Sequence, residues 1–176
     1  MVLISLRKGE RMKQKNRRIA LLGVFAGVAL VLAYAEALLP PLYAAVPGIK
    51  LGLPNIAIIF ILYRLGLREA AAVSFVRIVV VSLLFGNPMT FAYSVAGATL
   101  SLFGMWLLRR LDRFSVVGVS VVGAVLHNVG QILTAMLLLG TAELGYYLIV
   151  LTVTGTLSGI FVGLCGALTV NRIFLK

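Results

Sequence analysis

Charge is scarce in this sequence. Of its 176 residues only 12% are charged, whereas 61% are hydrophobic, and the mean hydropathy is +1.10. Soluble domains are about 25% charged, so the composition excludes a disordered chain and almost any water-soluble globule. The single cysteine, Cys165, excludes a disulfide within the chain and lies in an apolar run, where a packing role suits it. The sequence predicts an integral membrane protein.

The residues of most catalytic motifs are missing as well. Asp112 is the only aspartate, so the chain cannot form the paired-aspartate magnesium cluster needed for prenyl transfer to a diphosphate. A glycine-rich phosphate loop is absent, which excludes ATP hydrolysis by this chain. His127 is the only histidine and Cys165 lies on another segment, so we expect no metal site. We therefore expect no catalytic residue and no cofactor.

Six hydrophobic runs follow a basic N-terminal segment. They cover residues 19–39, 51–63, 67–85, 90–108, 115–139 and 145–170. A helix needs about 20 apolar residues to span the hydrocarbon. The second run is short, so we expect it to span with the help of residues 46–50, or to begin below the outer surface under a cover of other protein. The predicted organisation is a basic cytoplasmic tail over 1–18 and a single six-helix membrane domain over 19–176.

The basic residues support this count. With the N-terminus inside, six spans place all but two of the 16 Lys and Arg residues on the cytoplasmic side, as the positive-inside rule requires. Lys50 falls outside and Arg77 falls within a span. We therefore expect cytoplasmic termini, a multi-pass protein of the plasma membrane, and basic residues that meet the headgroups of the lipid bilayer instead of nucleic acid.

The start of the chain also resembles a signal peptide, because basic residues precede an apolar run and the sequence Ala33-Tyr34-Ala35. The apolar run is longer than a signal core, and its removal would destroy the charge alternation. We expect the first span to be retained.

Arg77 is the strongest functional candidate, since it lies near the middle of the third span. An arginine at the centre of a membrane costs roughly 2.5–3.5 kcal/mol on insertion scales, so its surroundings must offset that cost. Glu36, near the outer end of the first span, is within reach. The sequence allows two interpretations equally: an ion pair between Glu36 and Arg77 that joins two helices, or a site for an anionic ligand.

Two further groups of polar residues point toward the same region. His127, Asn128 and Gln131 share one face of the fifth span, beside Gly130, which admits a close neighbour. They either join helices by hydrogen bonds or contact a substrate. The proline-rich outer loop before the second span is expected to fold over the bundle as a lid. That lid would bring Lys50 and Asn55 toward Glu36 and Arg77, with Tyr34, Tyr43 or Tyr93 covering apolar parts of a ligand.

Small residues recur at helical spacing in two spans. They are Gly155, Gly159 and Gly163 in the sixth, and Gly23, Gly27, Ala29, Ala33 and Ala37 in the first. Such stripes let helices approach closely. For the sixth span we expect packing within the bundle, whereas the stripe of the first span is long enough to serve a separate membrane partner as well.

These features resemble the membrane S components of energy-coupling factor (ECF) vitamin transporters. More narrowly, the chain resembles the Gx transporter family, whose members are often labelled heptaprenyl diphosphate synthase component I. The narrower likeness covers nearly all of residues 17–170. It rests on Glu36 before the proline pair, the loop from Lys50 to Asn55, Arg77 followed by Leu84-Phe85-Gly86, Tyr93-Ser94, and the run His127-Asn128-x-Gly130-Gln131.

The resemblance implies a six-helix bundle that binds a small molecule near its outer face. It also implies docking through Ala29, Ala33 and Ala37, with Gly23 and Gly27 as rivals, onto a transmembrane T component driven by two ATPase subunits. The expected function is the substrate-binding subunit of an uptake transporter for a small anionic, isoprenoid-related or quinone-related molecule. The candidate substrate contacts are Glu36, Lys50, Asn55, Arg77, Tyr93, His127, Asn128 and Gln131.

Two other functions remain open. The family label implies a membrane accessory component of heptaprenyl diphosphate synthesis that is not catalytic by itself. The third alternative is a structural membrane protein whose polar groups only join helices.

Overall fold

The computed structural model describes residues 2–38 and 51–172, and these residues form helices connected by short turns, with no strand among them. The elements are α1 (Val2–Leu38), α2 (Pro54–Arg64), α3 (Leu67–Phe85), α4 (Pro88–Arg110), α5 (Val116–Leu139), the short 3₁₀ helix η1 (Ala142–Tyr146) and α6 (Tyr147–Arg172). The predicted all-α class is confirmed. The predicted third span coincides with α3, and α1 begins at Val2, so the helix runs through most of the segment predicted as a tail.

Four segments are long and apolar enough to cross a membrane: Met12–Leu38, Pro88–Arg110, Val116–Leu139 and Ala142–Arg172. By length and composition the chain is therefore a membrane protein. Helix α3 has 19 residues but contains Arg68, Glu69 and Arg77. Helix α2 has 11 residues, about 16 Å at 1.5 Å per residue, which is roughly half the thickness of the hydrocarbon layer.

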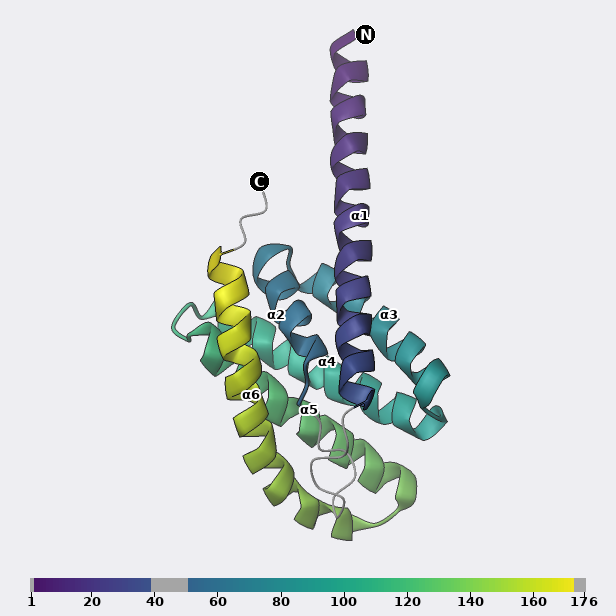
Figure 1. The fold of residues 1–176 in the computed structure, drawn as a ribbon, viewed down its shortest axis with the longest axis vertical. Helices are drawn as coiled ribbons and strands as arrows, with labels where there is room; N and C mark the ends of the chain where they lie inside the picture. The colour runs from purple at the N-terminus through teal and green to yellow at the C-terminus, as the bar shows by residue number, and fades with distance from the viewer. Residues whose placement is uncertain (1, 39–50, 173–176) are drawn as a thin grey trace.

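The helices divide into two groups around α2. Helix α5 packs along both α4 and α6, whereas α1 packs against α2 and α3, and α2 also contacts α6. Helix α1 continues beyond the other helices, and its beginning lies at the same end of the bundle as the last turn of α6 (Figure 1). The two groups meet through α2, which lies inside the bundle, and where α3 packs against α4.

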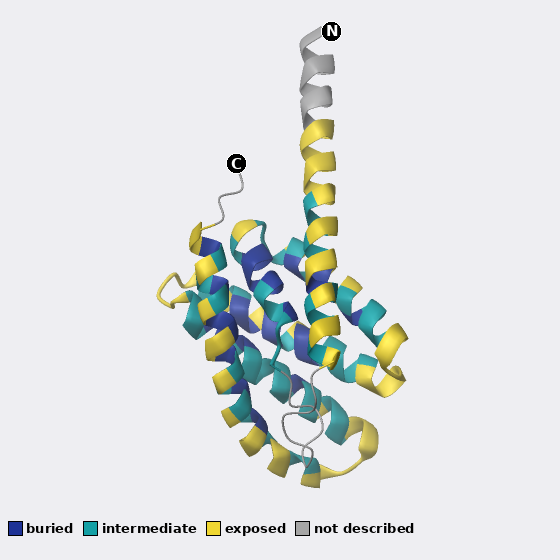
Figure 2. Cartoon of the chain, viewed as in Figure 1, coloured by how far each residue is buried: buried dark blue, intermediate teal, exposed yellow. Residues whose placement is uncertain are grey.

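Helix α2 can be short because it is surrounded by protein and not by lipid. Residues 57–62 are each at most 5% exposed, and Figure 2 shows the buried positions concentrated in α2 and on the sides of its neighbours that face it. Phe25 of α1 packs on Phe60 with ring centroids 4.9 Å apart. Protein covers α2, as one of the two alternatives for the second run requires. Residues 46–50, on which the other alternative depends, lie outside the described residues.

An arginine from α4 satisfies the last carbonyl groups of α2. Arg109 donates hydrogen bonds to the carbonyl oxygens of Leu62 and Tyr63, at 2.9 Å for Tyr63, and its guanidinium lies 5.2 Å from the centroid of the Tyr63 ring. A helix leaves its final carbonyl groups without partners, and burial away from water makes such groups costly. Arg109 removes that cost at the C-terminal end of α2.

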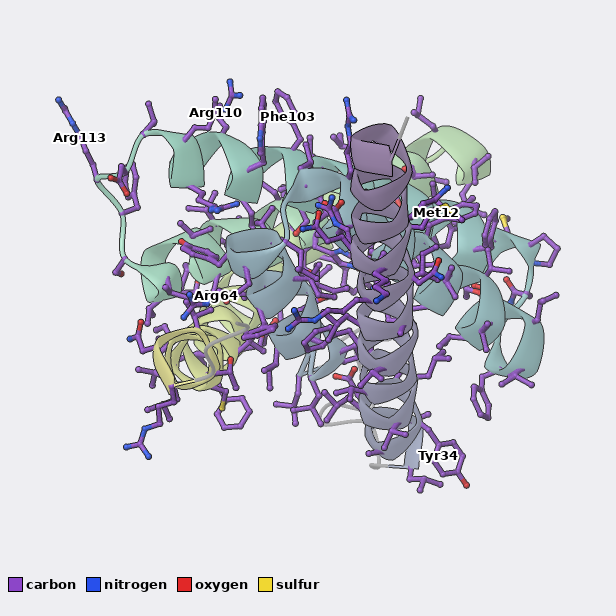
Figure 3. The ribbon with its side chains drawn as sticks, turned by 90° about the horizontal axis from the view of Figure 1, so that it is seen from above. Met12, Tyr34, Arg64, Phe103, Arg110 and Arg113 are labelled. Carbon is purple, nitrogen blue, oxygen red and sulfur yellow. The ribbon has the colours of Figure 1, made fainter. Side chains whose placement is uncertain are left out.

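Two more arginines fasten the same end of the bundle. Arg18 of α1 donates to the carbonyl oxygen of Leu65 at 3.3 Å and forms an ion pair with Glu69 at 2.6 Å. Arg64 lies beside α6 in Figure 3 and donates to the carbonyl oxygen of Val170. The basic residues at this end therefore link α1 to α3 and α2 to α4 and α6, in addition to the orienting role that the sequence predicts.

The glycines of α6 allow it to lie directly on α5. A Cβ atom at Gly159 would lie 2.7 Å from the Cα atom of Val121, and Gly155 and Gly163 are just as close to residues of α5. Such distances leave no room for a side chain. The predicted packing role of the glycine stripe in the sixth span is confirmed.

Candidate functional site

A cavity of about 210 Å³ lies between the helices, and all six contribute to its wall. Half of the lining residues are polar or charged, and Phe85 is the one Phe, Tyr or Trp among them. Polar side chains are expensive in a membrane interior and turn toward one another or toward a water-filled space. Polar residues from all six helices therefore gather at this cavity.

Six of the eight predicted substrate contacts line the cavity: Glu36, Asn55, Arg77, His127, Asn128 and Gln131. They come from four different helices and are distant in the sequence, so the structure brings them together. Lys50 lies outside the described residues.

Tyr93 does not line the cavity, although its neighbour Ser94 does. The Tyr93 hydroxyl instead donates to the sulfur of Met89, one turn earlier on α4, at 3.7 Å. Tyr34 is 52% exposed, and its ring centroid lies 6.1 Å from that of Phe85 on α3. Aromatic side chains of α1 and α4 thus lie outside the site.

Five hydroxyl-bearing residues of the lining were not predicted from the sequence: Ser82, Thr90, Ser94, Thr154 and Ser158. Ser and Thr are frequent in membrane helices, where they bond to their own backbone, and so they carry a weak signal individually. Four of the five form two pairs with a spacing of four residues, Thr90–Ser94 and Thr154–Ser158, so that each pair shares a helix face. This spacing is the pattern that could have identified them.

Arg77 has few partners in the cavity. Its Nη1 atom donates to the side-chain oxygen of Asn55 at 3.4 Å, and this is its one hydrogen bond to the described residues. No nitrogen of Arg77 lies within 4.0 Å of a Glu36 oxygen, since Arg18–Glu69 is the one ion pair in residues 12–38 and 51–172. Glu36 and Arg77 therefore do not join α1 to α3 by a direct ion pair.

Glu36 has a different role in the fold. Its Oε1 atom accepts the backbone N–H of Gly52 just before α2. The φ angle of Gly52 is +73°, a conformation that favours glycine. Glu36 therefore ties the C-terminal end of α1 to the turn that leads into α2, and both Glu36 and Gly52 line the cavity.

Asn128 joins α5 to α6. Its Nδ2 atom donates to the backbone carbonyl oxygen of Leu151 at 2.6 Å. The sequence allowed Asn128 either to join helices or to contact a substrate. The structure shows the link between helices, and Asn128 also forms part of the cavity wall.

Gln131 and His127 lie where α5 crosses α4. A Cβ atom at Gly97 would be 2.7 Å from the His127 carbonyl oxygen and 3.0 Å from Cγ of Gln131, and one at Gly130 would be 2.8 Å from the Cα atom of Gly97. The expected close neighbour of Gly130 is thus confirmed. The amide of Gln131 forms no hydrogen bond with the described residues, which leaves its donor and acceptor groups available in the cavity.

The small residues of α1 face two ways. Ala29 is fully buried in the core, and Ala33 and Ala37 line the cavity. A Cβ atom placed on Gly23 or Gly27 would meet no atom within 4 Å, so these two glycines face open space. Of the predicted docking stripe, Gly23, Gly27 and Ala37 are exposed.

Within the residues described, no group of three His, Cys, Asp or Glu side chains is placed to hold a metal ion. What the cavity offers is one guanidinium, one carboxylate, one imidazole, side-chain amides and hydroxyl groups. Groups of this kind bind a polar molecule by charge and hydrogen bonds.

The fold and the site together define a helical membrane protein with a polar cavity between its helices. Sequence comparison is more specific. The profile of the heptaprenyl diphosphate synthase component I family matches residues 25–169, and the chain belongs to that family. The matched region contains the whole cavity lining. No curated protein and no solved structure matches the chain.

Proposed function

We propose that this protein is the substrate-binding subunit of an ECF-type uptake transporter for a small polar molecule. The carrying observation is Arg77, whose guanidinium faces the cavity with a single long hydrogen bond to Asn55. A guanidinium has five N–H donors, and a charge at membrane depth requires partners. An anionic or carbonyl-bearing group of a ligand would supply them.

The size and polarity of the cavity favour a small ligand over a long isoprenoid. A volume of about 210 Å³ with a half-polar wall suits a compact molecule, whereas an apolar chain of seven isoprene units would leave the polar wall groups without hydrogen bonds. This supports the anionic class among the expected substrates.

The transporter proposal includes a topology and partners. Six spans with both termini in the cytoplasm of a plasma-membrane protein agree with the charge pattern and with the common end of the bundle at which α1 begins and α6 ends (Figure 1). A transmembrane T component and two ATPase subunits would supply the energy. The exposed face of α1, which includes Gly23 and Gly27, is available to a membrane partner.

The family name favours a second candidate function. A non-catalytic membrane component of heptaprenyl diphosphate synthesis would anchor or feed a soluble enzyme that supplies the magnesium-binding aspartates. It predicts co-purification with such an enzyme and loss of long-chain product when this chain is deleted.

Native mass spectrometry of protein extracted gently from its own membranes separates the two proposals. We expect the wild-type protein to carry a small polar molecule and ATPase partners, and Arg77→Gln to lose the small molecule. Arg113→Gln is the matched control, because Arg113 is exposed and projects away from the bundle (Figure 3). A wild-type protein that carries only lipid and a soluble prenyl synthase would overturn the transporter proposal.

A further inference from the structure

Two opposite charges face the cavity without neutralising each other directly. Arg77 and Glu36 both belong to its wall, yet they form no ion pair within 4.0 Å, and each is bonded to a different neighbour. We propose that the substrate is a zwitterion whose anionic group binds Arg77 and whose cationic, hydrogen-donating group binds Glu36. This inference rests on the proposed function and narrows its substrate class.

The arginine end of the site requires an acceptor. Its one bond, 3.4 Å long, ends on the side-chain oxygen of Asn55, so most of its N–H groups have no partner among the described residues. Carboxylate and phosphate groups match the planar guanidinium with two parallel hydrogen bonds. An anionic group at Arg77 would accept hydrogen bonds from the guanidinium N–H groups that Asn55 leaves unused.

The carboxylate end requires a donor. One oxygen of Glu36 accepts the N–H of Gly52, and a carboxylate has room for about four hydrogen bonds. The same cavity also contains the amide of Gln131, which has no hydrogen bond to the described residues. A protonated amine would satisfy Glu36, and Gln131 offers both a donor and an acceptor to further polar atoms of the ligand.

A ligand with one charge serves this pair poorly. A simple anion at Arg77 would leave the Glu36 carboxylate without a cationic partner and add a second negative charge to the same cavity. A simple cation at Glu36 would leave Arg77 without an anionic partner and add a second positive charge to the cavity. Leaving one member of a buried charge pair without its partner is costly, and like charges placed together discriminate against the wrong ligand. A zwitterion pairs both residues and keeps the cavity neutral.

The test uses three probes that share a flexible six-carbon chain: 6-aminohexanoate with both charges, hexanoate with the negative charge only, and hexylamine with the positive charge only. The flexible chain lets the two groups adapt to the separation of Arg77 and Glu36. Binding is measured by calorimetry on purified protein in lipid nanodiscs, with empty nanodiscs subtracted. We expect 6-aminohexanoate to bind at least tenfold more tightly than either singly charged probe.

Variants assign each charge. Glu36→Gln should reduce the affinity for 6-aminohexanoate to that for hexanoate, and Arg77→Gln should reduce it to that for hexylamine. Glu36→Asp keeps the charge and should retain the preference, which distinguishes lost recognition from lost folding. Arg113→Gln should leave all three affinities unchanged.

Three results would overturn the inference. Hexanoate that binds as tightly as 6-aminohexanoate, with no loss in Glu36→Gln, would identify a simple anion site and leave the proposed function intact. The failure of all three probes, together with a co-purified natural ligand that lacks one of the two charges, would reject the zwitterion and again leave the function intact. No probe bound and no natural ligand present would reject both.

Discussion

Neighbouring arginines at the end of α4 should differ sharply in their contribution to stability. Arg109 is half-buried and donates to the carbonyl oxygens of Leu62 and Tyr63. Arg110 is exposed, and its guanidinium lies 4.7 Å from the centroid of the Trp106 ring. We therefore predict that Arg109→Gln destabilises the bundle and that Arg110→Gln has little effect.

The expected loss follows from the bonds that Arg109 makes. Hydrogen bonds to charged groups contribute roughly 1.5–3 kcal/mol each, and two carbonyl groups of α2 would lose theirs. Glutamine or water can form part of the lost hydrogen bonds, so Arg109→Gln should lower the free energy of unfolding by about 3 kcal/mol. Because α2 contacts α1, α3 and α6, the loss should affect the whole bundle and not α2 alone.

Cys165 provides the assay. It is the single cysteine, free and half-buried on α6, so a dye that fluoresces on reaction with thiols reports unfolding at one site. Labelling should begin at a clearly lower temperature in Arg109→Gln than in the wild type, whereas Arg110→Gln should follow the wild type. Equal shifts in both variants would show that overall charge at this end, and not the bonds to α2, stabilises the protein.

Two further predictions concern the interior hydrogen bonds and the topology. Asn128→Ala should lower the free energy of unfolding by about 1 kcal/mol, because it removes the bond to Leu151, whereas Gln131→Ala should leave stability unchanged in the same thiol assay; a larger loss in Gln131→Ala would show that Gln131 joins helices. With Cys165 replaced by serine, a cysteine introduced by Arg113→Cys should react with a membrane-impermeant reagent only after the cells are opened. One introduced by Ala142→Cys should react in intact cells, and the reverse pattern would contradict the six-span orientation.

The candidate site could be predicted in part because a membrane penalises polar groups wherever they face lipid. Arg77 and the polar residues of α5 had to turn inward, and they line the cavity with Glu36 and Asn55. The partners within the cavity could not be predicted in the same way. Glu36 can reach either Arg77 or the backbone of Gly52 from its place on α1, and it bonds to Gly52.

Rotation of the helices accounts for the remaining differences. Successive residues on a helix point about 100° apart, so the structure brings Ser94 to the cavity and leaves Tyr93 outside. The sequence also does not say which side of α1 faces the bundle. In the structure Ala29 is buried, while Gly23 and Gly27 face open space. Periodicity identifies which residues share a face, but the packing of neighbouring helices decides where that face points.

The sequence alone determined that this protein is helical and belongs in a membrane, because long apolar runs between basic residues have few other stable arrangements. Only the tertiary structure decided that an 11-residue helix lies at the centre, that Arg109 and not Arg110 holds its end, and that Arg77 and Glu36 share a cavity without pairing. Each of these depends on distances between helices that are far apart in the chain. Such distances are set by side-chain packing and by groups that must find hydrogen-bond partners away from water.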